Sequence, residues 1–243
     1  VPLTDDEGRC LDETAEIAEE FNSYFTSVFT TEDLTNVPEP VKVCGAGSAG
    51  VLRDFDISVE DVKGKLLKLR ADKSGGPDEL KPRLLLNILE EISEPLCLLF
   101  NRSLKEGVVP GDWKNANVCP IFKNGSRHLA ANYRPVSLTS QICKVFESLM
   151  RDVIVRHLED NELLKDSQHG FRRGRSCLTN LLTFLDRVSG CLDEGEAVDV
   201  VFLDFAKAFD SVCHVKLIAK LKGYGVGGVL LRWISDFFNG MFS

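Results

Sequence analysis

The sequence has no apolar run near the roughly 18 residues that a membrane-spanning helix requires, and its first residues lack the basic-then-apolar pattern of a secretory signal. These absences predict an intracellular protein, in the nucleus or the cytoplasm, that does not enter membranes. Eight cysteines are scattered over the 243 residues without a Cys-x-x-Cys pair, and they form no cluster with the four histidines. This spacing argues against a zinc site and favours reduced thiols.

The net charge of −8 is distributed unevenly along the chain. Residues 1–62 hold 3 basic and 15 acidic side chains, whereas residues 113–175 hold 11 basic and 6 acidic ones, a net charge of +5. A polyanion such as nucleic acid would therefore meet a favourable potential in the middle of the chain. Charge alone leaves open the alternative that this basic face only contacts water.

Apolar periodicity predicts a helix-rich α/β chain with few strands. Helices are expected at 12–30, 58–70 (with Ser58 as N-cap), 81–91, 93–106, 141–160, 175–193, 214–222 and 229–239. Aperiodic glycines and prolines predict a loop or linker at 31–56. Residues 118–122 read as a strand whose proline places it at an edge or a bulge. Residues 198–204 read as a buried strand, because they are β-branched or aromatic and apolar up to Asp204, apart from Asp199.

A carboxylate ends this last predicted strand. An unpaired charge at Asp204 would be costly unless it were exposed in a cleft, paired or bound to a metal. Phe209, five residues further on, would form a flat wall within reach of whatever Asp204 holds. The segment from Val201 to Val212 closely resembles the first catalytic motif of reverse transcriptases from LINE-type (non-LTR) retrotransposons.

Three segments that precede this motif in the chain also resemble segments of that family, and they occur in the same order as in the family. Lys73-Ser-Gly-Gly-Pro-Asp78 is similar to its Lys-Ser-Pro-Gly-Pro-Asp segment, with Gly75 in place of proline. Residues 113–123 and 132–138 are similar to the two arms of its fingers hairpin. Residues 168–177 resemble its Gln-His-Gly-Phe-Arg-x-Gly-Arg-Ser element. Taken singly, each segment has a plainer interpretation, namely a tight turn, solvent-exposed cations or a basic loop before a helix.

The resemblance implies a role for the residues of the last motif. Asp204 and the backbone carbonyl of Phe205 would ligate Mg²⁺, with Mn²⁺ as an alternative ion. Phe209 would be the aromatic gate that excludes a ribose 2′-hydroxyl. Asp210 would have a structural role, as a helix cap or hydrogen-bond partner.

The resemblance also implies ligands for phosphates. Lys123 and Arg134 would bind the triphosphate of the incoming nucleotide, as a point charge and a planar fork. Nucleic acid would be contacted by Lys73, Arg172, Arg173, Arg175 and Ser176, the last at a helix N-terminus that favours anions. The expected partners are an RNA template, a DNA primer and deoxynucleoside triphosphates, with no membrane.

The implied architecture is a right-hand polymerase fold that comprises fingers and a partial palm. Residues 1–56 would form an acidic N-terminal helix and linker, residues 57–195 the fingers region, and residues 196–243 the partial palm with the first catalytic Asp. The family catalyses RNA-templated transfer of deoxynucleotides to a primer 3′-hydroxyl by two-metal phosphoryl transfer.

Two family elements are absent from the sequence, namely a Pro-Gln-Gly segment and a Tyr-x-Asp-Asp motif. Two-metal transfer needs several carboxylates, and a lone Asp204 would bind magnesium weakly. We therefore expect a reverse transcriptase truncated after the first palm motif, which lacks its C-terminal half and does not polymerise DNA alone. Two alternatives stay open: a non-catalytic RNA-binding protein derived from a retrotransposon, and a decayed product that leaves 198–203 as an aggregation-prone edge.

Overall fold

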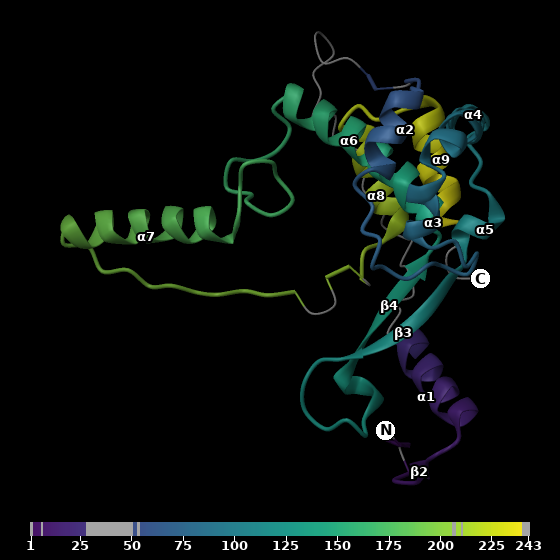
Figure 1. The fold of residues 1–243 in the computed structure, drawn as a ribbon. Helices are drawn as coiled ribbons and strands as arrows, with labels where there is room; N and C mark the ends of the chain where they lie inside the picture. The colour runs from purple at the N-terminus through teal and green to yellow at the C-terminus, as the bar shows by residue number, and fades with distance from the viewer. Residues whose placement is uncertain are drawn as a thin grey trace.

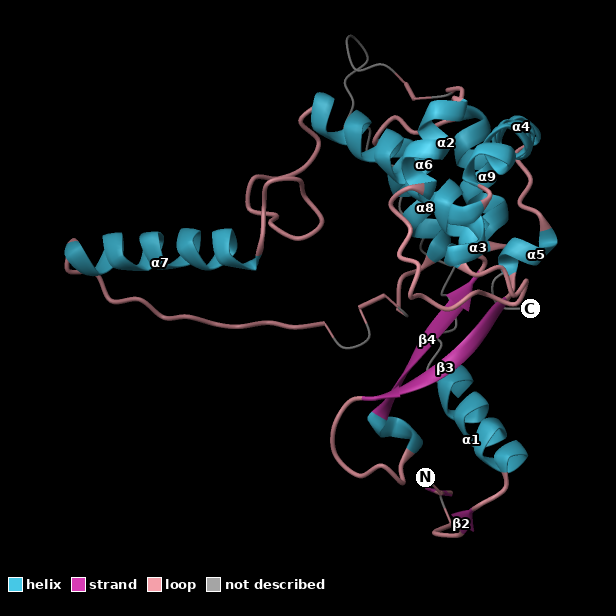
Figure 2. Cartoon of the chain, in the orientation of Figure 1, coloured by secondary structure: helices cyan, strands magenta, loops and turns pink. Residues whose placement is uncertain are grey.

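The computed structural model describes residues 2–5, 7–27, 51–52, 54–205, 208–209 and 211–239. A bundle of helices forms one end of the molecule, and a long β-hairpin projects from it (Figure 1). A small N-terminal unit packs against the far part of the hairpin, and one helix stands apart at the side (Figure 2). In the described part of the chain, no helix is long and apolar enough to cross a bilayer.

The bundle contains most of the predicted helices. Its members are α2 (Val59–Leu66), α3 (Pro82–Asn87), α4 (Leu89–Glu106), α5 (Gly111–Lys114), α6 (Gln141–Asp160), α8 (His214–Gly223) and α9 (Gly228–Phe238). Helix α2 begins as predicted because Ser58 and Asp61 form a reciprocal capping box. The one-turn helix α5 was not predicted; Pro110 is its N-cap residue, and Gly111 begins its single turn.

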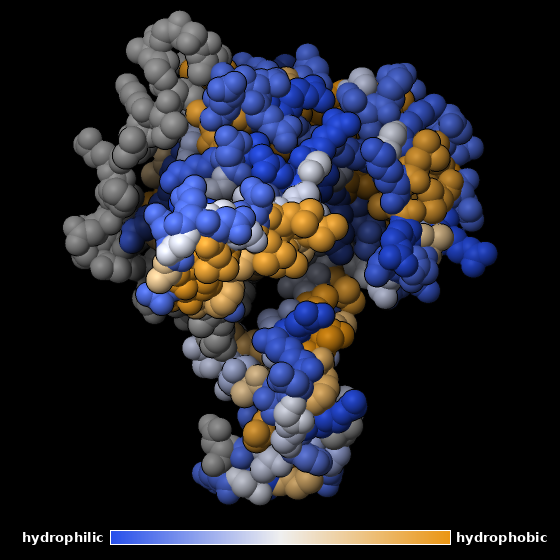
Figure 3. All heavy atoms as spheres, turned by 90° about the vertical axis from the view of Figure 1, so that its left-hand side faces the viewer, coloured by the Kyte–Doolittle hydropathy of each residue, from blue (hydrophilic) through white to orange (hydrophobic). Residues whose placement is uncertain are grey.

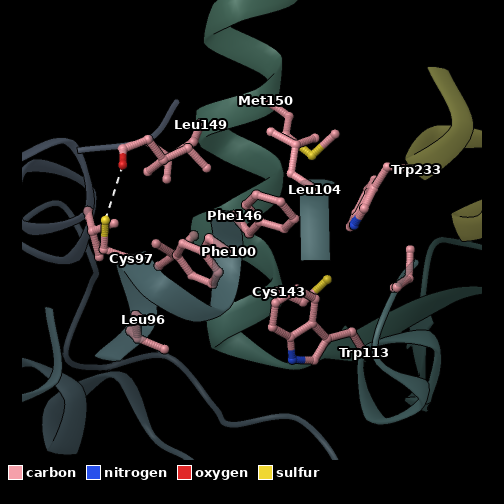
Figure 4. Close-up of a cluster of buried hydrophobic side chains, with 14 of the residues drawn as sticks. Leu96, Cys97, Phe100, Leu104, Trp113, Cys143, Phe146, Leu149, Met150 and Trp233 are labelled. Atoms are coloured by element: carbon pink, nitrogen blue, oxygen red, sulfur yellow. Dashed lines mark hydrogen bonds between the residues drawn. The ribbon is translucent and has the colours of Figure 1, made fainter. Parts of the chain in front are cut away.

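Aromatic side chains fill the centre of the bundle around α6 (Figure 4). The ring of Phe146 lies 4.8 Å from that of Phe100, 5.6 Å from Trp113 and 5.0 Å from Trp233, between centroids. The Trp233 indole N–H donates to the Ser103 hydroxyl, so its polar atom is satisfied in the core. Because Trp233 belongs to α9, the C-terminal helices share one core with α2, α4 and α6.

The end of the predicted linker is fixed to this bundle. Leu52 forms a parallel bridge with Val226, in which the Leu52 N–H donates to the Gly225 carbonyl and the Gly227 N–H donates to the Leu52 carbonyl. The Asn101 side chain bonds both the N–H and the carbonyl of Ile57. Most of the predicted linker, residues 31–50 together with Arg53, lies outside the described residues, as do residues 28–30 of the predicted first helix.

The hairpin consists of β3 (Ala116–Phe122) and β4 (Tyr133–Thr139), which pair in register from Ala116 opposite Thr139 to Phe122 opposite Tyr133. The Lys123 N–H donates to the Asn132 carbonyl, so this opposite pair is a hydrogen-bonded one. Bonded and non-bonded pairs alternate in an antiparallel ladder, which makes Pro120 and Pro135 a non-bonded pair. The prolines fit there because the missing N–H groups would point away from the partner strand. The prediction of an edge strand is thus confirmed.

A second, smaller core holds the N-terminal unit on the hairpin. It comprises α1 (Thr14–Ser27), β1 (Leu3–Thr4) and β2 (Cys10–Leu11), with the turn η1 (Ala130–Asn132). Phe21 and Phe25 of α1 are buried there with Leu3, Leu11 and Ala130. The predicted first helix is confirmed, but the two-residue strands were too short to show any periodicity.

The predicted strand at 198–204 is wrong: this segment has no regular structure, and Leu203 is 90% exposed. A strand requires a neighbour for its backbone hydrogen bonds, and the sheets of the described residues are β1–β2 and β3–β4. Helix α7 (Cys177–Asp193) forms as predicted, but no side chain on it is buried by other described residues. Hydrophobic side chains of α7 and of the segment after it are consequently exposed. Figure 3 shows hydrophobic surface on the side of the molecule where α7 lies. The exposed residues include Leu178, Leu181, Leu182, Leu185, Val201, Phe202 and Leu203.

Candidate nucleotide and nucleic-acid site

The two predicted triphosphate ligands lie near the outer end of the hairpin, and both are exposed. Arg134 is directly opposite Ile121, and Lys123 follows Ile121 by two residues. Since alternate residues of a strand share a face and opposite residues share it too, Lys123 and Arg134 are placed on one face of the hairpin. The structure therefore brings these two cations together.

The N-terminal helix covers the outer end of the opposite face of the hairpin. The rings of Phe122 and Tyr133 lie 5.4 Å apart, and Phe21 of α1 contacts Tyr133 edge-on at 4.9 Å. The Arg127 guanidinium lies over the Phe122 ring at 4.8 Å from its centroid. These contacts occupy the outer end of the apolar face, whereas Lys123 and Arg134 are exposed on the other face.

The turn that contains Lys73 packs against the base of the same hairpin. The Gln141 amide donates to the Ser74 carbonyl at 2.7 Å. A Cβ atom built on Gly76 would lie 2.6 Å from the Ser140 nitrogen and the Thr139 carbonyl carbon and oxygen. Only a glycine permits this approach, and no local sequence pattern predicts the contact. Lys73 itself is exposed beside this junction.

The basic loop before α7 is held to the start of that helix. Ser176 is the N-cap of α7, and its hydroxyl accepts a bond from the Thr179 N–H while the Thr179 hydroxyl accepts one from the Ser176 N–H. The nearly buried ring of His169 adds a contact at 2.9 Å between its Nδ1 atom and the Thr179 hydroxyl. The predicted helix start at this loop is confirmed.

The three arginines of this loop differ in their surroundings. Arg173 is exposed, whereas the side chains of Arg172 and Arg175 are 18% and 33% exposed. The Arg172 guanidinium donates to the Lys165 carbonyl at 2.9 Å. One carboxylate oxygen of Asp166 lies 3.7 Å from Arg172 and 3.5 Å from Arg175. The sequence motif at 168–177 does not include Asp166, which precedes it. The fold of the loop brings Asp166 to the two arginines.

The residues of the predicted catalytic motif lie in the irregular segment that leads from α7 back to the bundle (Figure 1). Asp204 and Phe205 are both exposed. Phe209 is 78% exposed, and its ring meets that of Phe171 edge-on at 6.4 Å, which joins the basic loop to this motif. Asp210 lies outside the described residues.

The donors around Asp204 do not by themselves make a magnesium site. Magnesium requires near-octahedral oxygen ligands in fixed positions. The described residues contain no group of three or more His, Cys, Asp or Glu side chains that could hold a metal ion. Asp204 and the Phe205 carbonyl thus provide at most part of a ligand set.

Comparison with known proteins gives consistent matches. The sequence model of the family described as reverse transcriptase (RNA-dependent DNA polymerase) matches residues 121–243, the second half of the chain. That range includes the outer end of the hairpin, the basic loop and the segment with Asp204.

Individual relatives agree with this match. A probable RNA-directed DNA polymerase from transposon BS of Drosophila melanogaster is 30% identical over 184 residues, which cover 74% of this chain and 20% of the relative. The RNA-directed DNA polymerase from mobile element jockey of the same fly is 29% identical over 68% of this chain and 18% of the relative. The Pol polyprotein from retrotransposable element R2 of Popillia japonica is 28% identical over 51% and 17%, respectively. The chain spans about a fifth of the length of these relatives.

Proposed function

Because this chain belongs to the reverse transcriptase (RNA-dependent DNA polymerase) family, we propose that it forms the fingers and first palm motif of the RNA-directed DNA polymerase of a non-LTR retrotransposon. The resemblance seen in the motifs is confirmed by the relatives, which come from such elements. The observation that carries the proposal is the hairpin, which places Lys123 and Arg134 on one face within the matched range.

In this proposal the hairpin, the basic loop with Lys73, and Phe209 contact different parts of the substrates. Lys123 and Arg134 bind the triphosphate of the incoming deoxynucleotide, since a guanidinium fork and an ammonium group together neutralise several phosphate oxygens. Lys73 and the basic loop contact the RNA template and primer backbone. Phe209 lies beside the sugar and excludes its 2′-hydroxyl.

The chemical step needs more than the described residues supply. Two divalent ions assist phosphoryl transfer when carboxylates from several segments hold them, and Asp204 is one such carboxylate. The described residues do not complete the ligand set of these ions. The 243 residues alone are proposed to bind nucleic acid without polymerising DNA.

A primer-extension assay tests this directly. The chain would be mixed with an RNA template, a DNA primer, deoxynucleotides and Mg²⁺, and compared with Asp204→Asn and with the control Asp199→Asn. The expected result is RNA binding that weakens as salt rises, with no extension by any of the three proteins. Extension that Asp204→Asn abolishes and Asp199→Asn retains would show that these residues suffice for catalysis, against the proposal.

A second candidate is an RNA-binding protein that has no catalytic partner segment. The basic loop, in which Arg173 is exposed and Arg172 and Arg175 are partly exposed, favours this candidate over a generic globular domain. Sequencing the transcript beyond the codon for Ser243 separates the two. An in-frame continuation into Pro-Gln-Gly and Tyr-x-Asp-Asp supports the polymerase, and a stop codon in a spliced, expressed transcript supports the binding protein.

A further inference from the structure

Asp166 is placed between two arginines of the basic loop. The same oxygen, Oδ1, lies 3.7 Å from Nη1 of Arg172 and 3.5 Å from Nη2 of Arg175. The Asp166 side chain is 95% exposed, while those of the two arginines are 18% and 33% exposed. An exposed carboxylate thus lies against two guanidinium groups that the loop partly covers.

Contacts that do not involve Asp166 fix the loop that carries the two arginines. Arg172 donates to the Lys165 carbonyl, and Arg175 directly precedes the capping box that fixes the start of α7. The ring of His169 also bonds Thr179 within that box. Two guanidinium groups that converge on one anionic oxygen are an arrangement that also suits a phosphate oxygen.

We propose that Arg172 and Arg175 form a binding site for a backbone phosphate of RNA, and that Asp166 occupies this site in the free protein. RNA binding displaces the carboxylate and puts a phosphodiester oxygen in its place. The inference rests on the proposed function, because it takes RNA as the ligand of this loop.

The physical balance favours displacement. Exposed ion pairs contribute little to stability, typically between about 0 and 1 kcal/mol, and Asp166 can return to water without losing buried contacts. A nucleic acid chain brings further phosphates to Arg173 and Lys73, and it releases counterions when it binds. Asp166 therefore lowers RNA affinity without blocking the site.

The test is to measure the affinity of the full chain for a fluorescently labelled single-stranded RNA at low and moderate salt. Asp166→Asn keeps the size of the side chain and removes its charge. We expect it to tighten binding about three- to tenfold at low salt, because two exposed ion pairs no longer compete. In a background of Arg172→Gln and Arg175→Gln, the same substitution is expected to change affinity less than about 1.5-fold.

A matched control accounts for the general effect of removing a negative charge. Asp186→Asn, on the exposed surface of α7, is expected to tighten binding clearly less than Asp166→Asn and by the same factor in both backgrounds. Circular dichroism of each variant verifies that the helices are intact.

The outcomes separate the inference from the proposed function. Unchanged or weaker binding by Asp166→Asn, or a gain that persists without the two arginines, would overturn the inference while RNA binding by the wild-type chain stands. A gain for a deoxynucleoside triphosphate but not for RNA would overturn it too. If the wild-type chain binds no RNA at any salt concentration, both the inference and the RNA-binding part of the proposed function fail.

Discussion

At the scale of single residues, Gly76 allows the turn at residues 73–78 to pack closely against the base of the hairpin, because glycine has no side chain. Its backbone lies against Thr139 and Ser140, at the end of β4 and the start of α6. We expect Gly76→Ala to lower the free energy of unfolding by about 1–3 kcal/mol, because the added methyl group would clash with backbone atoms that cannot rotate away. Urea denaturation measures the change.

Gly64 offers the matched control. It lies within α2, and no atom lies within 4 Å of the Cβ that would be added there. Gly64→Ala is therefore expected to raise the free energy of unfolding by roughly 0.5–1 kcal/mol, since alanine favours the helix. Equal effects of the two substitutions would contradict the close approach at Gly76.

Glu147 is a half-buried acidic residue of α6. Burial raises the pKa of its carboxyl above the usual 4.5, and the Cys143 thiol donates to it at 3.3 Å. A raised folded-state pKa means that the ionised carboxylate opposes folding above that pKa, and that this penalty disappears as pH falls toward 4.5.

Glu147→Gln removes the penalty while keeping an amide that can still bond Cys143. We expect the variant to have a higher free energy of unfolding than the wild type at pH 7, with the difference shrinking as pH is lowered. Denaturation curves at several pH values test this. A difference that stays constant with pH would show that the charge is not its cause.

At the scale of elements, α2 and α7 have the same N-terminal device and different surroundings. Each begins with a serine in a capping box, Ser58 in α2 and Ser176 in α7. Helix α2 buries Val62 and Leu66 in the main core, whereas α7 buries no side chain against the described residues. The same substitution should therefore have a global effect in one helix and a local effect in the other.

Ser58→Ala is expected to lower the global free energy of unfolding by about 1 kcal/mol. Ser176→Ala is expected to leave it unchanged and to speed amide hydrogen exchange in the first turn of α7 roughly fivefold, which corresponds to the same cap energy. Denaturation and hydrogen exchange measured on both variants test the pair. A global loss from Ser176→Ala would mean that α7 is packed against the rest of the molecule.

The elements also show what the sequence can and cannot predict. Helices 141–160 and 175–193 were predicted because apolar periodicity and caps are local signals. The prediction of a strand at 198–204 was wrong because local composition favours a strand but does not show whether a neighbouring strand is present to accept its backbone hydrogen bonds. The contact of Asp166 with Arg172 and Arg175 depends on how the loop folds back, which no local pattern encodes.

At the scale of the whole molecule, two separate hydrophobic cores stabilise different parts of the chain. Phe146 lies in the bundle core and Phe21 in the small core on the hairpin. Phe146→Ala is expected to lower the free energy of the main unfolding transition by about 3–5 kcal/mol, because it leaves a cavity among three aromatic rings. Phe21→Ala should leave that transition unchanged and loosen only the outer part of the hairpin.

Denaturation followed by Trp113 and Trp233 fluorescence reports on the bundle, since both indoles are buried there. Hydrogen exchange in β3 and β4 reports on the hairpin, and it should accelerate in Phe21→Ala. A shift of the tryptophan transition in Phe21→Ala would instead show that the two cores unfold as one cooperative unit.

The paired prolines of the hairpin disfavour edge-to-edge association between copies of this chain. A two-stranded hairpin has two open edges, and each is a template for further strands. Pro120 and Pro135 face each other in a non-bonded pair, so both edges lack an outward N–H donor at the same level. Added strands would lose a hydrogen bond there on either side. Self-association of the molecule would consequently begin at the exposed apolar side chains of α7 and 198–203, and the hairpin face with Lys123 and Arg134 would remain open.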